Sequence, residues 1–182
     1  MKITIGLVGA PAAGKGTIAA YLEKTRGAKK FRFSDPLFDI LVRLGIVSTR
    51  DNMIKLSEIL RATFGETLLA EALLADAQRC DAELIVVDGV RREGDVAALR
   101  RLPGFHLAAI STQPELRFER SKIRAEKSGE ATQSYKEFLA LEQRSTETSA
   151  RELEKTAEVT FDNNNGLDNL YRQIDEFVMR IS

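Results

Sequence analysis

The segment GAPAAGKGT, at positions 9–17, has the residue types and spacing of a loop that binds phosphate groups. It follows the apolar run ITIGLV and contains the pattern Gly-x-x-x-x-Gly-Lys. Glycines let backbone N–H groups curl around an anion, and the N-terminus of a following helix adds positive potential. The Lys15 ammonium adds a full charge for the terminal phosphates. The residues that we expect around a nucleoside triphosphate are Gly9, Ala12, Ala13, Gly14, Lys15, Gly16 and Thr17.

The residue after the lysine is unusual for such a loop. Most loops of this kind carry Ser or Thr there, and its hydroxyl binds Mg²⁺. Gly16 removes that hydroxyl, so we expect Mg²⁺ to be held mainly by phosphate oxygens and water, which suits its reluctance to dehydrate. Thr17 is a weak candidate for the metal and is better placed for a phosphate nearer the sugar.

A second chemically informative stretch is LIVVDGVRR, at positions 84–92. Its continuous apolar run is typical of a buried parallel strand, and Asp88 would end that strand at the carboxyl edge of the sheet. A carboxylate there can hold the water shell of Mg²⁺. The alternative is that Asp88 only caps the end of the strand.

Arginines recur along the chain at places where a second phosphate could bind. Arg120 and Arg124 are four residues apart on a predicted helix and therefore share a face. Planar guanidinium groups suit a phosphoryl group in transfer, because its charge is spread over three oxygens. Arg61 lies near the end of another predicted helix. A solvated helix surface is the alternative explanation for all three.

The loop resembles that of the adenylate kinase and nucleoside monophosphate kinase family, in which Gly-Lys-Gly-Thr is usual. The segment after the third strand is similar to the family's Asp-Gly-Phe-Pro-Arg, with Arg91 in place of the proline. The resemblance implies ATP and Mg²⁺ as cofactors and Asp88 as the metal-side carboxylate. It also implies that Arg92 binds the acceptor phosphate, with Arg91 as a close rival.

The sequence Ser-Asp-Pro-Leu, at positions 34–37, is more similar to the deoxynucleotide kinase and dephospho-coenzyme A kinase side of the superfamily. Asp35 could there face the acceptor or lie near the attacking oxygen, and it could equally cap the next helix. The resemblance also implies a lid that closes over the transferring phosphate. The residues assigned by resemblance to the lid and to adenine are Arg120, Arg124, Arg144, Asn163 and Asn164.

Short apolar runs predict five strands, at residues 3–8, 31–33, 84–87, 107–110 and 158–161. Helical patterns occupy residues 15–26, 51–64, 66–79, 93–101, 114–127, 135–144 and 167–181, and a further helix begins near Pro36. Alternating strands and helices predict an α/β fold with a five-stranded, mostly parallel sheet, which in this superfamily is the three-layer P-loop NTPase fold. The expected core is residues 1–33, 84–112 and 157–182. An acceptor-binding insertion would span residues 34–83 and a lid residues 113–156.

The amino-acid composition restricts which partners, metal sites and cellular locations we expect for this protein. The 182 residues contain 27 basic and 27 acidic side chains, so the overall charge does not suggest strong binding to nucleic acid. A single cysteine, Cys80, excludes an internal disulfide, and with His106 as the one histidine we expect no zinc site. No apolar run is long enough to span a bilayer. We expect a cytoplasmic protein that is a monomer or a homodimer.

These patterns predict an ATP-dependent kinase that acts on a small phosphorylated acceptor, most simply a nucleoside or deoxynucleoside monophosphate. Dephospho-coenzyme A kinase is an alternative, and its sugar hydroxyl would need a nearby carboxylate such as Asp35. A nucleotide-dependent switch or ATPase is the alternative from a different class. The absence of an Asn-Lys-x-Asp guanine motif argues against a GTP-dependent switch.

Overall fold

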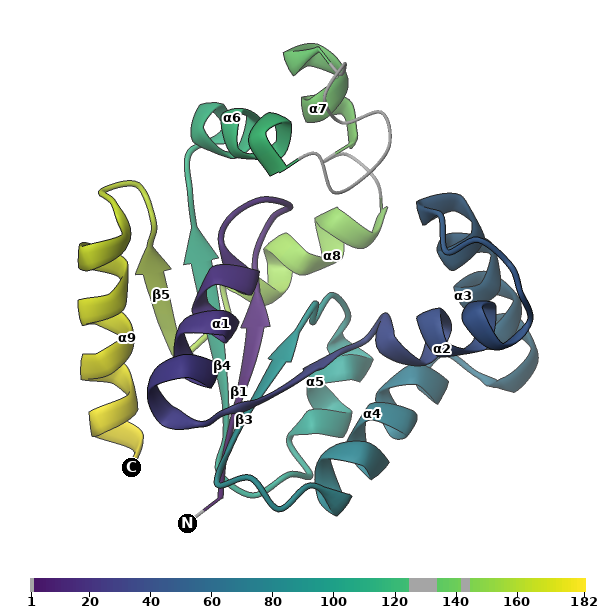
Figure 1. Ribbon diagram of the computed structural model, residues 1–182, viewed down its shortest axis with the longest axis horizontal. Helices are drawn as coiled ribbons and strands as arrows, with labels where there is room; N and C mark the ends of the chain where they lie inside the picture. Colours follow the sequence, from purple (N-terminus) through teal and green to yellow (C-terminus); the bar gives the residue numbers. More distant parts are fainter. Residues whose placement is uncertain (1, 125–133, 142–144) are drawn as a thin grey trace.

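The computed structural model describes residues 2–124, 134–141 and 145–182 of the chain. Its centre is a five-stranded parallel sheet with the order β2-β3-β1-β4-β5 (Figure 1). The strands are β1 (Ile3–Val8), β2 (Lys29–Arg32), β3 (Leu84–Asp88), β4 (Phe105–Ser111) and β5 (Val159–Asp162). The predicted α/β architecture with a parallel sheet is confirmed.

Helices cover both faces of the sheet, and each face has its own apolar core. On one face lie α1 (Lys15–Arg26) and α9 (Leu167–Ile181), whose buried side chains pack on alternate residues of the strands. On the other lie α4 (Leu68–Arg79), α5 (Glu93–Leu99) and α8 (Ser145–Glu154). Burial on both sides explains why β1 and β3 are apolar at nearly every position.

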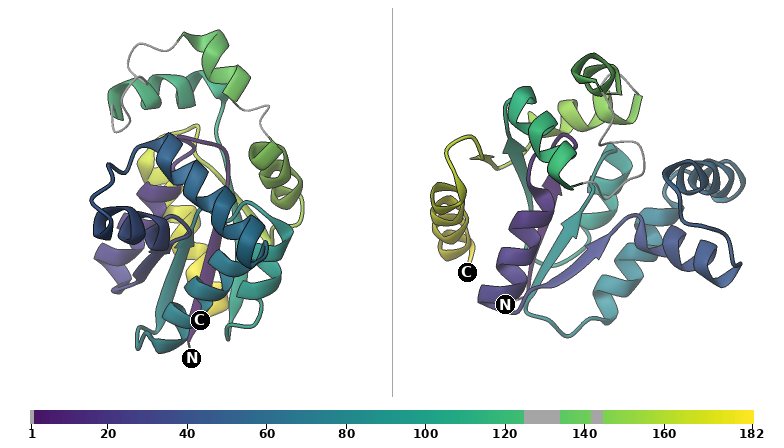
Figure 2. Two further views of the ribbon diagram at one scale, coloured as in Figure 1. Left: turned by 90° about the vertical axis from the view of Figure 1, so that its right-hand side faces the viewer. Right: turned by 45° about the horizontal axis from the view of Figure 1, so that its top comes forward.

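Two further groups of helices stand beyond the carboxyl ends of the strands (Figures 1 and 2). After β2 come α2 (Asp35–Arg43) and α3 (Arg50–Phe64), which pack on each other and on α4 beside the sheet. After β4 come α6 (Pro114–Arg124) and α7 (Tyr135–Leu141), which pack together above it. The proposed acceptor-binding and lid regions therefore both border the edge where the strands end.

The sequence patterns locate all five strands, with shifts at their ends. The second strand runs over Lys29–Arg32 rather than residues 31–33, because an edge strand tolerates polar residues that hide its period. No separate helix was predicted at α8, although Ala150 and Leu153 bury it against the sheet. The last helix of the proposed lid region therefore belongs to the core packing.

Among the residues that the structure describes, no helix is long and apolar enough to cross a membrane.

We expect Leu153→Ala to destabilise the protein by about 2–4 kcal/mol, because it removes a buried side chain that anchors α8 on the sheet. The exposed neighbour provides a matched control, and Glu152→Ala should change the free energy of unfolding by about 0.5 kcal/mol or less. Urea denaturation followed by circular dichroism measures both. Equal stabilities of the two variants would contradict the packing of α8.

Candidate active site

The glycine loop connects β1 to α1 in a conformation that only its particular residues allow. Gly14 precedes α1 with φ of 115°, in the region that favours glycine. A Cβ atom at Gly14 would lie 2.3 Å from Asn163 Nδ2. Ala12, with φ of 59°, is the one non-glycine residue with positive φ among those described. The loop is therefore a strained turn that packs closely against the segment after β5.

The carbonyl oxygen of Ala13 accepts two hydrogen bonds from neighbouring strands. Asn163 donates through Nδ2 at 2.7 Å, and Thr112 donates through Oγ1 at 2.9 Å. Arg117, which is 4% exposed, donates through Nε to the carbonyl of Thr112 at 3.0 Å. Because these bonds hold the Ala13 carbonyl against the sheet, the following amides at the start of α1 can face the opposite side, where an anion would bind.

The Lys15 ammonium lies over the loop itself. Its Nζ donates to the carbonyl of Gly9 at 2.6 Å and to that of Ala10 at 3.0 Å. These bonds fold the side chain back across the turn. A terminal phosphate bound at the loop would therefore lie close to both the Lys15 ammonium and the N-terminus of α1.

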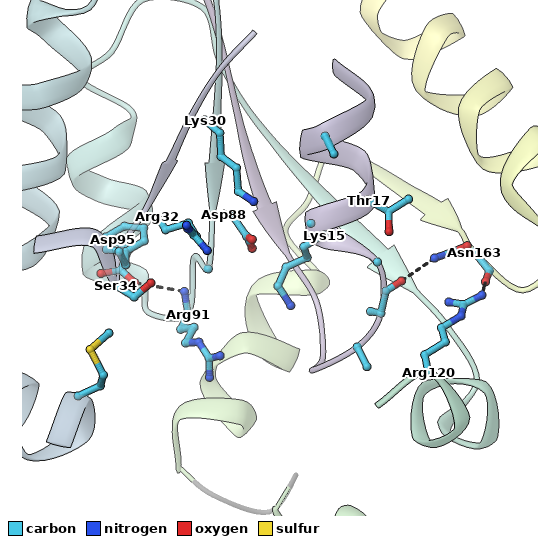
Figure 3. Close-up of a pocket in the computed structure, with 18 of the residues that line it drawn as sticks. Lys15, Thr17, Lys30, Arg32, Ser34, Asp88, Arg91, Asp95, Arg120 and Asn163 are labelled. Carbon is cyan, nitrogen blue, oxygen red and sulfur yellow. Dashed lines mark hydrogen bonds between the residues drawn. The ribbon is translucent and has the colours of Figure 1, made fainter. Parts of the chain in front are cut away.

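A cavity of about 1800 Å³ joins the loop to the inserted helices α2 and α3 (Figure 3). Most of the residues predicted for the site line it, from the loop, the end of β3, and α3, α5 and α6. Those lining residues are Ala12, Ala13, Gly14, Lys15, Gly16, Thr17, Arg61, Asp88, Arg91, Arg92, Arg120 and Asn163. The structure thus brings together side chains from six separate segments.

The remaining predicted residues lie elsewhere. Gly9 is at the start of the loop, and a Cβ there would lie 3.0 Å from the carbonyl oxygen of Ile110. Asn164 accepts from the backbone N–H of Gln113 at 2.8 Å and so ties the end of β5 to the start of α6. Neither residue lines the cavity within the described part of the chain, and their contacts with ATP stay predictions.

Asp35 also lies outside the cavity lining. Its carboxylate accepts from the Arg32 backbone N–H at 2.8 Å and from Arg32 Nε at 3.1 Å. Asp35 therefore orients a cavity residue, and a direct contact with the acceptor stays a prediction. Arg124 ends α6 with its side chain outside the described part of the structure, and Arg144 lies outside the described residues.

Asp88 lies at the carboxyl end of β3, beside Leu7 of β1 and Arg32 of β2. Figure 3 shows it between Lys15 and the side chains of β2, facing the cavity. Gly16 adds room on the other side, since a Cβ at this position would meet no atom within 4 Å. The cradle, the lysine and the carboxylate fit a triphosphate with Mg²⁺, for which Asp88 and Thr17 are the available oxygen ligands.

Arg120 lies at the glycine-loop end of the cavity, beside Asn163 (Figure 3). Its Nη2 donates to the carbonyl of Asn163 at 3.0 Å. Two buried polar atoms here have no hydrogen-bond partner among the described residues, namely Arg120 Nη1 and Asn163 Oδ1. Unpaired buried groups are costly, so this end of the cavity is suited to a polar ligand.

Three of the arginines predicted for the acceptor come together at the far wall of the cavity. Arg61 is 8% exposed, and its pKa is lowered by burial and by the nearby charge of Arg92. Glu66 lies against both: its carboxylate binds Arg92, and one oxygen is 3.8 Å from Arg61 Nη1. Arg91 lines the same wall. Two mutually repelling guanidinium groups that share one carboxylate form a natural anion site.

Sequence reasoning missed the residue that shapes this wall. Asp95, in the first turn of α5, is 3% exposed and accepts hydrogen bonds of 3.1 Å from the backbone N–H groups of Arg91 and Arg92. Burial raises the pKa of its carboxyl, while those N–H groups and the charge of Arg61 act against the rise. The spacing of three residues between Arg92 and Asp95, typical of a helix start, was the available signal.

Lys30, Arg32 and Ser34 were also missed, and all three line the cavity. They alternate with Phe31 and Phe33, which pack into the core on the opposite face of the sheet. This alternation could have revealed them, because residues two apart on a strand share a face.

A family model described as an AAA domain, AAA_17, matches residues 8–139, which is more than half of the chain. The chain belongs to this family. The matched region runs from the last residue of β1 through β4 and α6 to residue 139. It therefore contains the loop and all the cationic residues that line the cavity, but neither Arg144 nor the asparagines after β5.

Proteins of similar sequence are named UPF0200 proteins. That of Hyperthermus butylicus is 28% identical over 123 residues, which cover 68% of this chain and 66% of that protein, slightly less than two thirds of its length. That of Methanoculleus marisnigri is 30% identical over 125 residues, covering 68% and 67%. One from Saccharolobus islandicus is 24% identical over 182 residues, covering 96% and 92%.

Solved structures with the same fold include kinases. TT1252 from Thermus thermophilus superposes with a TM-score of 0.65 at 20% identity, over 100% of this chain and 98% of that one. Shikimate kinase from Bacteroides thetaiotaomicron gives 0.64 at 13% identity, over 98% of each chain. The predicted P-loop kinase-like fold is confirmed. The finer resemblance to nucleoside monophosphate kinases is not shown by these relatives.

We expect Gly14→Ala to destabilise the protein by about 1–3 kcal/mol, because the new methyl group would meet Asn163 in a backbone conformation that alanine rarely adopts. Gly16→Ala is the matched control: its methyl group enters open space, and stability should stay within about 0.5 kcal/mol of the unaltered protein. Thermal and urea unfolding without nucleotide measure both. A Gly14→Ala protein as stable as the control would contradict the loop geometry.

Proposed function

We propose that this protein transfers a phosphoryl group from ATP, with Mg²⁺, to a small phosphorylated acceptor, namely a nucleoside or deoxynucleoside monophosphate. The single observation that carries the proposal is one cavity with two cationic ends. The glycine loop forms one end and the arginines near Asp95 form the other, with Asp88 between them. A donor and an acceptor phosphate could meet in such a cavity.

On the donor side, the loop amides and Lys15 would bind the terminal phosphates, and Thr17 a phosphate nearer the sugar. Bound Mg²⁺ would neutralise charge between the phosphates, and Asp88 would hold its water ligands. Arg120 and Asn163 would contact the nucleoside, where their unpaired buried atoms call for polar partners. Phosphoryl transfer of this kind needs positioning and charge neutralisation more than a strong base.

On the acceptor side, Arg61, Arg91 and Arg92 would hold the acceptor phosphate with its oxygen directed at the donor. Asp95 positions the backbone of two of these arginines. Closure by the proposed lid, with Arg124 and Arg144, would exclude water, which otherwise competes as the acceptor. The confirmed kinase-like fold supports this arrangement, and three structural neighbours are named shikimate kinases.

The two alternatives are less well supported by this geometry. Dephospho-coenzyme A kinase would need a carboxylate at the acceptor hydroxyl, and the Asp35 carboxylate, which does not itself line the cavity, is paired with Arg32. A nucleotide-dependent switch would have no use for a second set of arginines in the cavity. Both remain measurable outcomes of the same experiment.

The test is ADP release from ATP and Mg²⁺ in the presence of each nucleoside and deoxynucleoside monophosphate in turn, with dephospho-coenzyme A beside them. We expect one acceptor to raise turnover by about 10²-fold or more over hydrolysis, because a bound acceptor gains from proximity that water lacks. Lys15→Ala serves as the blank and should abolish turnover. Slow hydrolysis that no acceptor changes would contradict the kinase and favour the switch.

Glu66 provides a separate prediction, because its carboxylate contacts Arg61 and Arg92, two of the arginines that would bind an acceptor phosphate. Its side chain is 69% exposed, so it can leave the arginines at little cost. We expect Glu66→Gln to lower KM for the acceptor by about two- to fivefold, as removal of an exposed ion pair would, with kcat nearly unchanged. Glu71→Gln, which alters an exposed pair with Arg101 outside the cavity, is the control. A raised KM would show instead that Glu66 positions the arginines.

A further inference from the structure

We propose that Lys30 and Arg32 form a second anion-binding subsite, and that the acceptor carries another phosphate group besides the one that is extended. The inference rests on the proposed transfer to a phosphorylated nucleoside, and it changes the acceptor from a nucleoside monophosphate to a nucleoside bisphosphate. The second group would take no part in the transfer and would serve only recognition.

The strand register places the two cations beside Asp88. In the parallel register of β2 and β3, the Cα atom of Arg32 lies opposite that of Asp88. The Cα atom of Lys30 lies opposite that of Val86, two residues earlier. Side chains two apart on a strand point to the same face, so Lys30, Arg32 and Asp88 share the face covered by α1. Figure 3 shows all three directed into the cavity.

The two cations differ in how their charge is compensated, since Arg32 forms an ion pair with Asp35 and Lys30 forms none with a described residue. Lys30 is half-buried and forms no ion pair or hydrogen bond with any described residue. Asp35 binds Arg32 through Nε and the backbone N–H, which leaves the terminal guanidinium nitrogens available. A half-buried cation without a counter-ion is unfavourable unless a ligand supplies the negative charge.

Ser34 adds an uncommitted hydroxyl to the same group. It precedes α2 as the N-cap, yet its side chain makes no capping bond to the helix. Ser34 lines the cavity together with Lys30 and Arg32. A phosphate bound there could therefore accept from an ammonium, a guanidinium and a hydroxyl.

This subsite is distinct from the arginines that would hold the reacting phosphate. Arg61 and Arg92 come from α3 and the start of α5, whose apolar residues pack on the opposite face of the sheet. Phe33, Leu37 and Met53 line the cavity as apolar surface. A ligand that carries two separate anionic groups on an apolar body would match these two sets of cations and the apolar surface.

The net charge of the cavity lining also supports a second phosphate on the acceptor. Eight cationic and three acidic side chains of the described residues line it, an excess of five positive charges. One phosphate monoester brings about two negative charges at pH 7. A magnesium-bound triphosphate also carries about two negative charges, so together with a single monoester it leaves about one positive charge unmatched, and the cavity can accept further negative charge on the acceptor.

The experiment is calorimetric titration of the whole protein with its donor site saturated by Mg²⁺ and a non-hydrolysable ATP analogue. The probes are the 5′-monophosphates and 3′,5′-bisphosphates of the four common ribonucleosides and of the four common deoxynucleosides. We expect one bisphosphate to bind about tenfold or more tightly than its monophosphate, since it gains a charge-assisted contact. Lys30→Ala should remove this advantage and leave the affinity for the monophosphate unchanged.

Lys29→Ala is the matched control, because Lys29 is an exposed neighbour on the same strand that does not line the cavity. Thermal unfolding confirms that each variant is folded. Equal affinity for both probes, or a Lys30→Ala variant that weakens both equally, would overturn the second subsite. Monophosphates that bind and turn over without a bisphosphate advantage would leave the proposed function standing. If no probe binds while the ATP analogue does, both proposals fail.

Discussion

The carbonyl oxygen of Ala13 is the point on which the candidate site depends. Thr112 and Asn163, from the ends of β4 and β5, both donate to it, and Arg117 supports the first of them. With its oxygen fixed toward the sheet, the loop can present its next amides to the cavity. Gly14 has no side chain that would obstruct this contact. The conformation of the loop is therefore set by residues about 100 positions or more later in the chain.

A parallel sheet extends the same organisation across the cavity. All strands end at one edge, so β3 delivers Asp88 and β2 delivers Lys30 and Arg32 to the region beside the loop. The long connection after β2 then supplies Arg61, and the turn after β3 supplies Arg92. The order of the strands thus sets the spacing between the residues proposed for the donor, for the metal side and for the acceptor.

Local patterns predicted the parts of the site that local structure determines. The glycine loop and Asp88 could be recognised because strand, turn and charge lie together in the sequence. The partnership of Glu66 with Arg92 and the buried position of Asp95 could not, because they arise when α3, α4 and α5 pack against each other. Lys30 was missed although it alternates with apolar residues, because the edge strand β2 has no continuous apolar run. Helix α8 was missed because only two of its described residues, Ala150 and Leu153, pack in the core, and two apolar positions make no clear helical period.

The most direct test of the central claim follows the γ-phosphoryl group itself. The protein is incubated for a single turnover with Mg²⁺ and γ-labelled ATP, together with a mixture of phosphorylated nucleosides, and the products are separated. The account predicts that the label appears in a phosphorylated nucleoside extended by one phosphate. Label found only in inorganic phosphate, or left entirely in ATP, would contradict it.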